Sequence, residues 1–299
     1  MNHEATSFRI GVMCGASEQI VDRFLAHNLP NLEPAGVSLQ VVVLDEDLAG
    51  SGVSTGGILT ADLNRRWGQL WGRAKRQGRI AGCSSLTAAL RILLYQVLTR
   101  RYRRDKLAGR RFPSDIRVVK VPTLNSAAAI EAVQSAGCDL VCLMGARILT
   151  RRTLDAMSAS IVNIHSSDPR WVRGGPVVVW EVLAGHPALT LTVHEVTPAV
   201  DAGAILAERT QPVMYRGGLG ATTQATMVAA RPKVGDLFEQ VIRDMAVGNE
   251  QRTSFTPGTL KVTPNLYQSL RAEMLCRWRS RPPHRIDGAA PSLPEADQF

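Results

Sequence analysis

The chain has 299 residues, of which 45% are hydrophobic and 20% are charged, with a mean hydropathy of −0.03 and a net charge of +9. These values exclude a disordered or fibrous chain and are typical of a globular protein with one large α/β domain and an extension, or with two small domains. No run of eighteen apolar residues occurs, so the sequence contains no candidate for a membrane-spanning helix.

The N-terminal segment and the cysteines indicate the compartment. Residues 1–7 are polar and lead directly into an apolar segment, without the basic and apolar regions of a secretory signal, so we expect a cytoplasmic protein. The five cysteines form no Cys-x-x-Cys pair and no set at zinc-ligand spacing. We therefore expect buried thiols in a reducing compartment and no metal site. These cysteines are Cys14, Cys83, Cys138, Cys142 and Cys276.

The first half of the chain alternates predicted strands and helices. A continuous apolar run such as 39–44 is typical of a strand buried on both faces of a sheet. The helix that begins after Ser126 has a capping residue at its start and Gly137 at its end. This β-α-β order predicts an α/β fold with a Rossmann-like, mostly parallel sheet flanked by helices. The expected strands are 8–13, 39–44, 116–121 and 139–144, with helices from 16 to about 28 and over 127–136.

Residues 65–111 form a basic insertion. They contain 14 Lys and Arg and one acid, Asp105, a balance of +13, so the remainder of the chain sums to −4. Apolar residues from Leu86 to Leu98 follow helical spacing, and Trp67 and Trp71 share one face of an earlier helix. The segment predicts a basic helical hairpin for an anionic partner: a nucleotide or phosphorylated acceptor, RNA, a carrier protein or a membrane surface. The alternative is a surface insertion that packs its aliphatic face on the domain and keeps its charges solvated.

Residues 161–169 contain the strongest candidate for a catalytic site. Side chains two apart on a strand project from the same face, so Asn163 and His165 point the same way at the end of a predicted strand. An amide donor beside an imidazole suits a carbonyl carbon that becomes tetrahedral. Asp201 follows in a glycine-containing turn before another strand, where α/β folds place functional loops. The alternative is a hydrogen-bonding pair at a strand end and an ordinary turn aspartate.

The order of several short motifs resembles the folate-dependent formyltransferase family. That family includes methionyl-tRNA formyltransferase, glycinamide ribonucleotide formyltransferase, formyltetrahydrofolate deformylase and sugar N-formyltransferases. The resemblance covers roughly residues 115–210. The motifs are Asp139 to Leu149, Asn163-x-His165, Pro169, Arg173-Gly174, Thr190 to His194, and Asp201-x-Gly203 with Ile205.

The resemblance implies a catalytic group of Asn163, His165 and Asp201. It also implies 10-formyltetrahydrofolate as formyl donor. One departure concerns the acceptor side, because many members have Ser-Leu-Leu-Pro where this chain has the more polar run 166–169. The residues implied to bind the donor are Met144, Gly145, Arg147, Ile148, Leu149 and Val200, and those implied to bind the acceptor are Asp168, Arg173 and Gly174.

In the second half of the chain we expect fewer strands than in the first half. His186 is expected in a surface loop and His194 as a structural histidine on a half-buried strand. The expected elements are a helix over 177–183, a strand over 191–196, a loop over 211–223, a helix over 227–246 interrupted near Pro232, and a helix over 266–278. We therefore divide the chain into a catalytic domain over 1–225, a short helical extension over 226–278 and a disordered tail over 279–299.

The predicted reaction is transfer of a formyl group from 10-formyltetrahydrofolate to a primary amine of a small molecule, such as an amino sugar or a phosphorylated metabolite. Too little ordered chain follows residue 210 for the large RNA-binding domain of methionyl-tRNA formyltransferases, so tRNA is not favoured. Two alternatives remain open: a 10-formyltetrahydrofolate hydrolase, and a non-catalytic protein that binds through the basic insertion. The sequence carries no signal for the oligomeric state.

Overall fold

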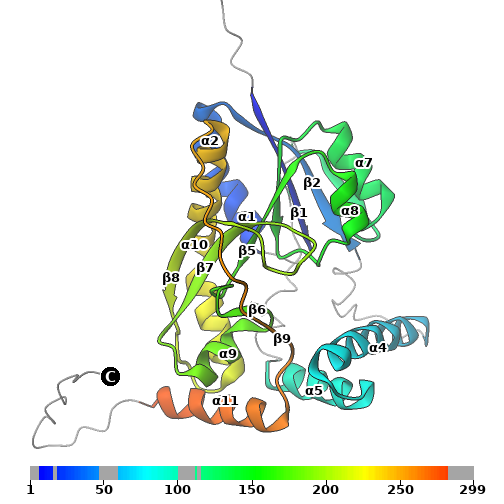
Figure 1. Ribbon diagram of the computed structural model, residues 1–299, viewed down its shortest axis with the longest axis vertical. Coiled ribbons are helices and arrows are strands. Elements are labelled where there is room, and N and C mark those ends of the chain that lie inside the picture. Colours follow the sequence, from blue (N-terminus) through cyan, green and yellow to red (C-terminus); the bar gives the residue numbers. More distant parts are fainter. Residues whose placement is uncertain (1–6, 16–18, 47–59, 100–111, 113–115, 282–299) are drawn as a thin grey trace, which may run out of the picture.

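A computed structural model of the protein describes residues 7–15, 19–46, 60–99, 112 and 116–281. Seven strands form one sheet in the order β3-β2-β1-β4-β5-β7-β8, parallel from β3 to β5 and antiparallel at β7 and β8 (Figure 1). The α/β fold with a mostly parallel sheet is thus confirmed. The strands are β1 (Phe8–Gly15), β2 (Val37–Asp45), β3 (Val118–Val121), β4 (Leu140–Met144), β5 (Ser160–His165), β7 (Ala188–Glu195) and β8 (Ile205–Pro212).

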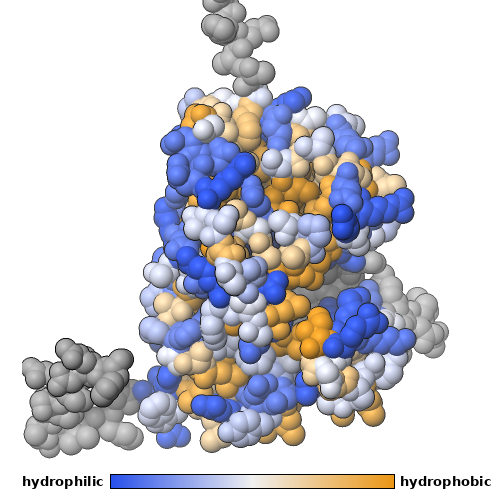
Figure 2. Space-filling model, viewed as in Figure 1, coloured by the Kyte–Doolittle hydropathy of each residue, from blue (hydrophilic) through white to orange (hydrophobic). Residues whose placement is uncertain are grey.

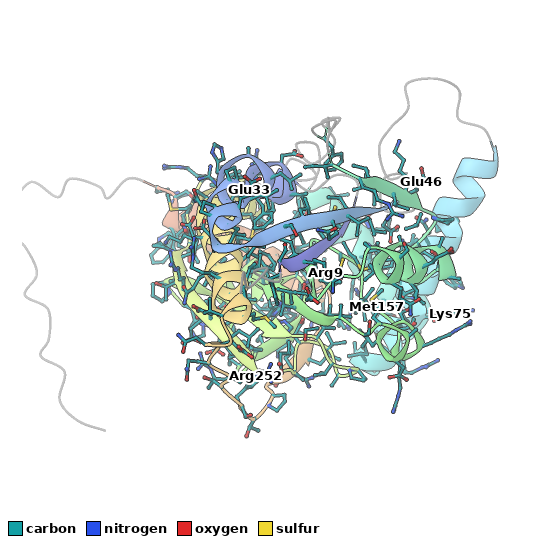
Figure 3. The ribbon with its side chains drawn as sticks, turned by 90° about the horizontal axis from the view of Figure 1, so that it is seen from above. Arg9, Glu33, Glu46, Lys75, Met157 and Arg252 are labelled. Atoms are coloured by element: carbon teal, nitrogen blue, oxygen red, sulfur yellow. The ribbon has the colours of Figure 1, made fainter. Side chains whose placement is uncertain are left out.

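Helices cover both faces of this sheet. Viewed from above, the strands lie between the layer of α10 and the layer that contains Met157 (Figure 3). Phe24 and Phe238 lie in the main core and meet edge to face, with their ring centroids 6.4 Å apart. One layer contains α1 (Gln19–Arg23), the π-helical turn η1 (Phe24–Asn28), α2 (Leu29–Leu32) and α10 (Leu219–Ala246), and the other contains α7 (Ala127–Ser135) and α8 (Arg151–Ala156). A 3-10 turn, η2 (Glu33–Ala35), connects α2 to β2.

Helix α10 corrects the sequence-based prediction in two respects. It begins at Leu219, where a loop was predicted, and it continues through Pro232 as one helix. Ala230 and Val234 on either side of the proline are both buried. Their packing offsets the roughly 3 kcal/mol that a proline costs inside a helix. The predicted boundary after residue 225 falls inside this helix, and the division into domains stays a prediction.

Helix α8 was not predicted at all. Thr150 caps it through a hydrogen bond from the backbone N–H of Thr153 to its side chain. The helix has only six residues, which is too short for the apolar periodicity that identifies helices in a sequence. It follows the loop after β4 and helps to fix that loop beside the sheet.

The lower part of the molecule joins residues far apart in the sequence. A short strand, β6 (Val172–Gly174), pairs in parallel with β9 (Thr259–Lys261), next to α9 (Val177–Ala184) and α11 (Leu266–Arg279). Gly174 has a φ of +75°, and a Cβ there would lie 2.7 Å from the carbonyl oxygen of Lys261. Only glycine therefore fits at this contact. The capping box at Asn265 starts α11, which agrees with the predicted helix 266–278.

Two helices, α4 (Thr60–Ala81) and α5 (Ser85–Leu98), form most of the described part of the basic insertion, and we call them the helix pair. The predicted helical character is confirmed for this part. Within the described residues no single helix is long and apolar enough to cross a membrane; Trp67–Ala81 and Ser85–Leu98 satisfy length and composition only together, with a bend of 109° between them. The predicted loop over 49–59, the basic residues 100–111 and residues 282–299 of the predicted tail lie outside the described residues.

The packing of Phe238 in the main core predicts how much free energy of unfolding is lost when its ring is removed. Phe238→Ala is expected to lower the free energy of unfolding by about 3–5 kcal/mol, because Phe238 is fully buried and its removal leaves a cavity against Phe24. Urea unfolding measures this change. Val247→Ala, at a side chain that is 67% exposed, is the control and is expected to stay within about 0.5 kcal/mol of the wild type. Equal losses in the two variants would contradict the assigned core.

Candidate functional site

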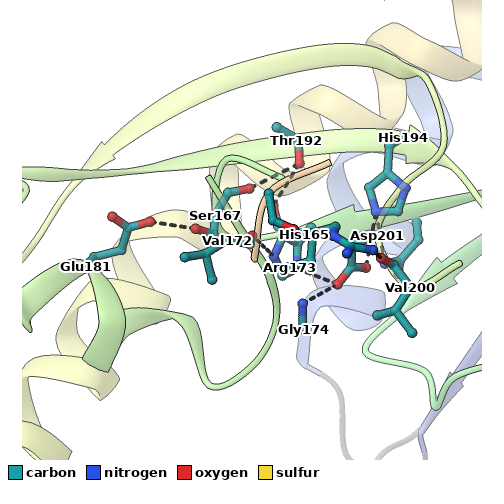
Figure 4. Close-up of polar contacts among 12 residues, drawn as sticks. His165, Ser167, Val172, Arg173, Gly174, Glu181, Thr192, His194, Val200 and Asp201 are labelled. Carbon is teal, nitrogen blue, oxygen red and sulfur yellow. Dashed lines mark hydrogen bonds and ion pairs between the residues drawn. The ribbon is translucent and has the colours of Figure 1, made fainter. Parts of the chain in front are cut away.

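Two of the predicted catalytic residues, His165 at the end of β5 and Asp201, lie side by side (Figure 4). Asp201 lies in the turn between β7 and β8 with a φ of 46°, the left-handed region that non-glycine residues rarely adopt. The backbone N–H of Gly174 donates a hydrogen bond of 2.9 Å to its Oδ2. The turn and β6 thus hold this side chain from two directions.

Two imidazoles flank this carboxylate. Nδ1 of His165 lies 3.5 Å from Oδ2 of Asp201, and Nε2 of His194 lies 3.5 Å from Oδ1. Nδ2 of Asn163 lies 3.5 Å from the same Nε2 of His194. The three residues predicted to be catalytic therefore come together, and His194 joins them as a fourth member.

His194 is the site residue that the sequence analysis missed. It was assigned a structural role because a histidine on a half-buried strand usually has one. The antiparallel pairing of β5 with β7 places His194 directly opposite Asn163. Nδ1 of His194 donates to the carbonyl oxygen of Glu195 at 2.8 Å, which directs Nε2 into the site. Strand register was the missing information, and the sequence carries no direct signal for it.

For both His165 and Asp201, burial shifts the pKa in one direction and a neighbouring charged group opposes that shift. Burial lowers the pKa of His165 below its ordinary value, although the charge of Asp201 opposes this change. Burial alone would raise the pKa of Asp201, but the hydrogen bond with His194, the charge of His165 and the N–H of Gly174 together lower it. Near neutral pH the site thus pairs an ionised carboxylate with an uncharged His165.

His165 lies between two oxygen acceptors. Its Nε2 is 3.3 Å from the carbonyl oxygen of Val172, while its Nδ1 faces Asp201. A neutral imidazole carries one N–H, whereas the protonated form can donate to both oxygens. This arrangement favours uptake of a proton that burial otherwise disfavours, which suits a group that accepts and returns a proton during a reaction.

Two cavities meet at this group. The smaller, of about 280 Å³, is lined by Asn163, His194 and Asp201 together with apolar side chains of the loop after β4. The larger, of about 650 Å³, is lined by His165 and by one face of the helix pair. Gly174 and Gly175 line both cavities. The catalytic group therefore lies between two separate binding spaces.

The residues implied to bind the donor fall mostly around the smaller cavity. Arg147, Ile148, Leu149 and Val200 line it, whereas Gly145 lines the larger one. Met144 is fully buried in the core of the sheet and lines neither of these two cavities.

An ion pair fixes the loop that contains Arg147. The guanidinium contacts the fully buried carboxylate of Asp45 through two nitrogens, and Nη2 to Oδ1 measures 2.7 Å. Asp45 also accepts a hydrogen bond from the backbone N–H of Leu124. Because an Arg–carboxylate pair of this geometry is rigid, the wall of the smaller cavity is held in place from β2.

Two of the residues implied to bind the acceptor have local partners instead. Asp168 accepts hydrogen bonds from the backbone N–H and the side chain of Arg170. Arg173 donates to the carbonyl oxygens of Gly258 and Val200, at 2.9 and 3.0 Å. Neither side chain lines the two cavities, whereas Gly174 lines both. A role for Asp168 and Arg173 in acceptor binding stays a prediction that this geometry does not favour.

A buried chain of polar groups supports the loop after His165. Ser167 donates a hydrogen bond of 2.6 Å to the buried Glu181, whose second oxygen lies 2.7 Å from Nδ1 of His186. The His186 ring also packs against Trp171, with ring centroids 4.5 Å apart. His186 is an exposed loop histidine, as predicted, with a side chain that is 46% exposed, and it contacts Glu181 and Trp171 from that loop. This network explains the polar run after His165.

No group of three or more His, Cys, Asp or Glu side chains within the described residues could hold a metal ion. The absence of a metal stays a prediction.

Comparison with known proteins relates this geometry to one family. Residues 111–230 match a family model described as formyl transferase. A methionyl-tRNA formyltransferase of Levilactobacillus brevis is 25% identical over 179 residues, 56% of this chain and 55% of that protein. A glycinamide ribonucleotide transformylase 1 from Symbiobacterium toebii superposes with a TM-score of 0.51 at 18% identity, covering 84% of this chain and 95% of that one. A sugar N-formyltransferase from Shewanella sp FDAARGOS_354 gives a TM-score of 0.50 at 11% identity, covering 85% and 76%.

The sheet order places the protein among α/β proteins with the formyltransferase fold. Within that class, residues 111–230 match the model of the formyl transferase family. The matched segment contains β3 to β8 with Asn163, His165, His194 and Asp201, and it leaves out β1, β2, the helix pair and α11. The chain spans about half the length of the curated relative that it matches.

The close packing around Gly203 predicts that a larger residue there destabilises the Asp201 turn. A Cβ at this position would lie 2.0 Å from the carbonyl oxygen of Glu195, so Gly203→Ala must displace backbone. We expect a loss of roughly 1–3 kcal/mol in the free energy of unfolding, measured by urea titration. Gly72→Ala, with nothing within 4 Å, is the matched control and is expected to leave stability equal or higher. A Gly203→Ala protein as stable as the control would refute this packing.

The lowered pKa of His165 predicts a pH dependence of stability. The unfolded chain binds this proton at a higher pH than the folded protein does, near the ordinary value of 6.5. The stability that neutral His165 contributes is therefore complete above that value and decreases as the pH falls towards the folded pKa. Between about pH 7.5 and 5.5 the free energy of unfolding of the wild type should fall more steeply than that of His165→Gln. Parallel pH profiles in urea unfolding would contradict the assignment.

Proposed function

We propose that the protein transfers the formyl group of 10-formyltetrahydrofolate to a primary amine of a small molecule. The observation that carries this proposal is the position of the Asn163, His165 and Asp201 group between two cavities. A transferase needs one space for the donor and one for the acceptor, and both must reach the same reacting carbon. The family match of residues 111–230 supports formyl transfer as the chemistry.

The smaller cavity is proposed to bind the donor. Its wall combines apolar side chains with backbone groups of the loop after β4, and such walls suit a flat heteroaromatic ring with polar edges. Ile148 is 70% exposed, and a ring in this cavity would cover part of its side chain. The formyl group would then point towards Asn163 and His165, at the junction with the larger cavity.

The proposed chemistry uses the side chains that meet there. The amine nitrogen attacks the formyl carbon, and Asn163 and His165 stabilise the oxyanion that develops. The amine loses a proton to the Asp201 and His165 pair as the new C–N bond forms. The bond from the formyl carbon to the donor nitrogen then breaks, and that nitrogen receives a proton. The products are a formamide and tetrahydrofolate, with no net change in protons at the site.

The larger cavity is proposed to bind the acceptor. Polar side chains of the helix pair line it, including Arg73, Gln77 and Gln96, and Thr263 lines it as well. Such a wall suits a polar acceptor that carries an anionic group, for example an amino sugar or a phosphorylated amine. Two relatives support this class by name, since one acts on a glycinamide ribonucleotide and another on a sugar. The curated relative acts on methionyl-tRNA, so tRNA belongs among the acceptors tested.

The five cysteines are unpaired, which supports a reducing, cytoplasmic location as part of the same proposal.

The test is to incubate the protein with 10-formyltetrahydrofolate and three sets of acceptors: none, a pool of amino sugars and phosphorylated amines, and aminoacylated initiator tRNA. Release of tetrahydrofolate and products heavier by one formyl group are measured. Release that requires a small amine supports the proposal and names the acceptor. Release without any amine would instead identify a hydrolase, and formylation of the tRNA alone would replace the small-molecule acceptor.

The catalytic assignment predicts the effect of removing single side chains. Asn163→Ala and His165→Ala are each expected to lower the rate of formyl transfer by about a hundredfold or more, because each removes a group that stabilises the oxyanion. Circular dichroism and the unfolding midpoint show whether each variant is folded. Arg151→Ala, at a side chain that is 80% exposed, is the matched control and should keep full activity. Folded variants with undiminished turnover would refute these roles.

A further inference from the structure

Helix α5 presents two opposite faces. Ala88, Ala89 and Ile92 are buried, and Tyr95 and Gln96 line the larger cavity. Large apolar side chains cover the other face and are exposed: Leu86 62%, Leu90 60%, Leu93 40% and Val97 63%. Their spacing of four, three and four residues places them in one stripe along the helix. Among the residues that the structure describes, this stripe is left uncovered.

Helix α11 carries a second exposed stripe. Leu270 is 46%, Met274 70% and Trp278 65% exposed, and Tyr267 one turn earlier is 71% exposed. Helices α5 and α11 are in contact, and both lie at the lower end of the molecule (Figure 1). In the same orientation, hydrophobic atoms reach the lower edge of the surface (Figure 2). We call the two stripes together the apolar end face. Eight exposed large apolar residues thus lie on two neighbouring helices, and exposed apolar patches often mark interaction sites.

Exposed tryptophans also occur on α4, which packs against α5. Trp67 and Trp71 on α4 are 58% and 39% exposed, so that with Trp278 three of the five tryptophans of the chain are exposed on α4 and α11. Tryptophan and tyrosine combine an apolar ring with a polar N–H or O–H, and they concentrate where hydrocarbon meets water.

The charges of the helix pair indicate that a partner of the apolar end face would be anionic. From Trp67 to Thr99 the sequence has five Lys and Arg and no acid. Lys75, Arg76 and Arg79 are exposed, and Lys75 projects at the outer edge of the molecule (Figure 3). Arg271 and Arg277 are exposed beside the stripe on α11. Helices that lie in the plane of an anionic membrane surface typically combine exposed leucines, tryptophans and basic residues.

We propose that the apolar end face docks on the surface of a membrane that contains anionic lipids. The helices lie in the interface and do not cross the bilayer, because the 109° bend between α4 and α5 prevents a straight span. The leucines and tryptophans enter the boundary between headgroups and acyl chains, and the basic side chains contact the lipid phosphates. This inference concerns another surface and does not depend on the proposed reaction.

The experiment is flotation of the full chain with vesicles of phosphatidylcholine alone and of phosphatidylcholine mixed with phosphatidylglycerol. We expect binding to the anionic vesicles, a shift of tryptophan fluorescence to shorter wavelength on binding, and weaker binding as salt increases from about 0.1 to about 0.5 M. Leu90→Ser with Leu93→Ser should weaken partitioning by at least about tenfold, because two apolar side chains no longer enter the interface. Met274→Ser is expected to weaken it in the same direction.

Matched controls separate docking from loss of folding. Val247→Ser removes an exposed apolar side chain at the C-terminal end of α10 and should bind vesicles like the wild type. The unfolding midpoint shows that each variant is folded. Absence of binding to anionic vesicles, or binding that the leucine variant leaves unchanged, overturns the proposal. A dimer of the wild type that the same variant dissociates, without vesicle binding, would assign the face to self-association instead.

Discussion

The site depends on one carboxylate in a backbone conformation that aspartate rarely adopts. Asp201 reaches His165, His194 and the N–H of Gly174 only because its turn is left-handed at that position. Gly203 allows the turn to lie against Glu195, where no side chain would fit. The side chain of Asp201 thus links residues of three elements, β5, β6 and β7. Strain in the backbone is compensated by these contacts, as is common at functional sites.

Much of this arrangement could be predicted from local patterns. Apolar runs identified the strands of the parallel sheet, and the spacing of Asn163 and His165 placed both on one face of β5. Other features depended on contacts between distant segments. His194 enters the site through strand register, α10 passes Pro232 because its flanks are buried, and Arg173 is held by carbonyl groups of remote loops. No pattern within a few neighbouring residues encodes such contacts, since each needs the tertiary structure first.

The helix pair links the two proposals through one element. On its inner face α5 contributes Tyr95, Gln96 and Thr99 to the larger cavity, and on its outer face it carries Leu86, Leu90, Leu93 and Val97. A small core of Ala74, Ala88, Ala89 and Ile92 holds α4 against α5. The helix pair, which belongs to the basic insertion, is therefore also a wall of the proposed acceptor site. Contact with an anionic surface would act directly on that wall.

The parallel pairing of β6 with β9 bears on how this protein can be divided or recombined. Gly174 faces both cavities, yet the strand that fixes it lies at residues 259–261, beyond the segment that matches the family model. A chimera that took only residues 111–230 would carry every imidazole and carboxylate of the site but not the strand that positions Gly174 against Asp201. A chimera that is to keep the site must therefore also include β9, as a second segment of the chain.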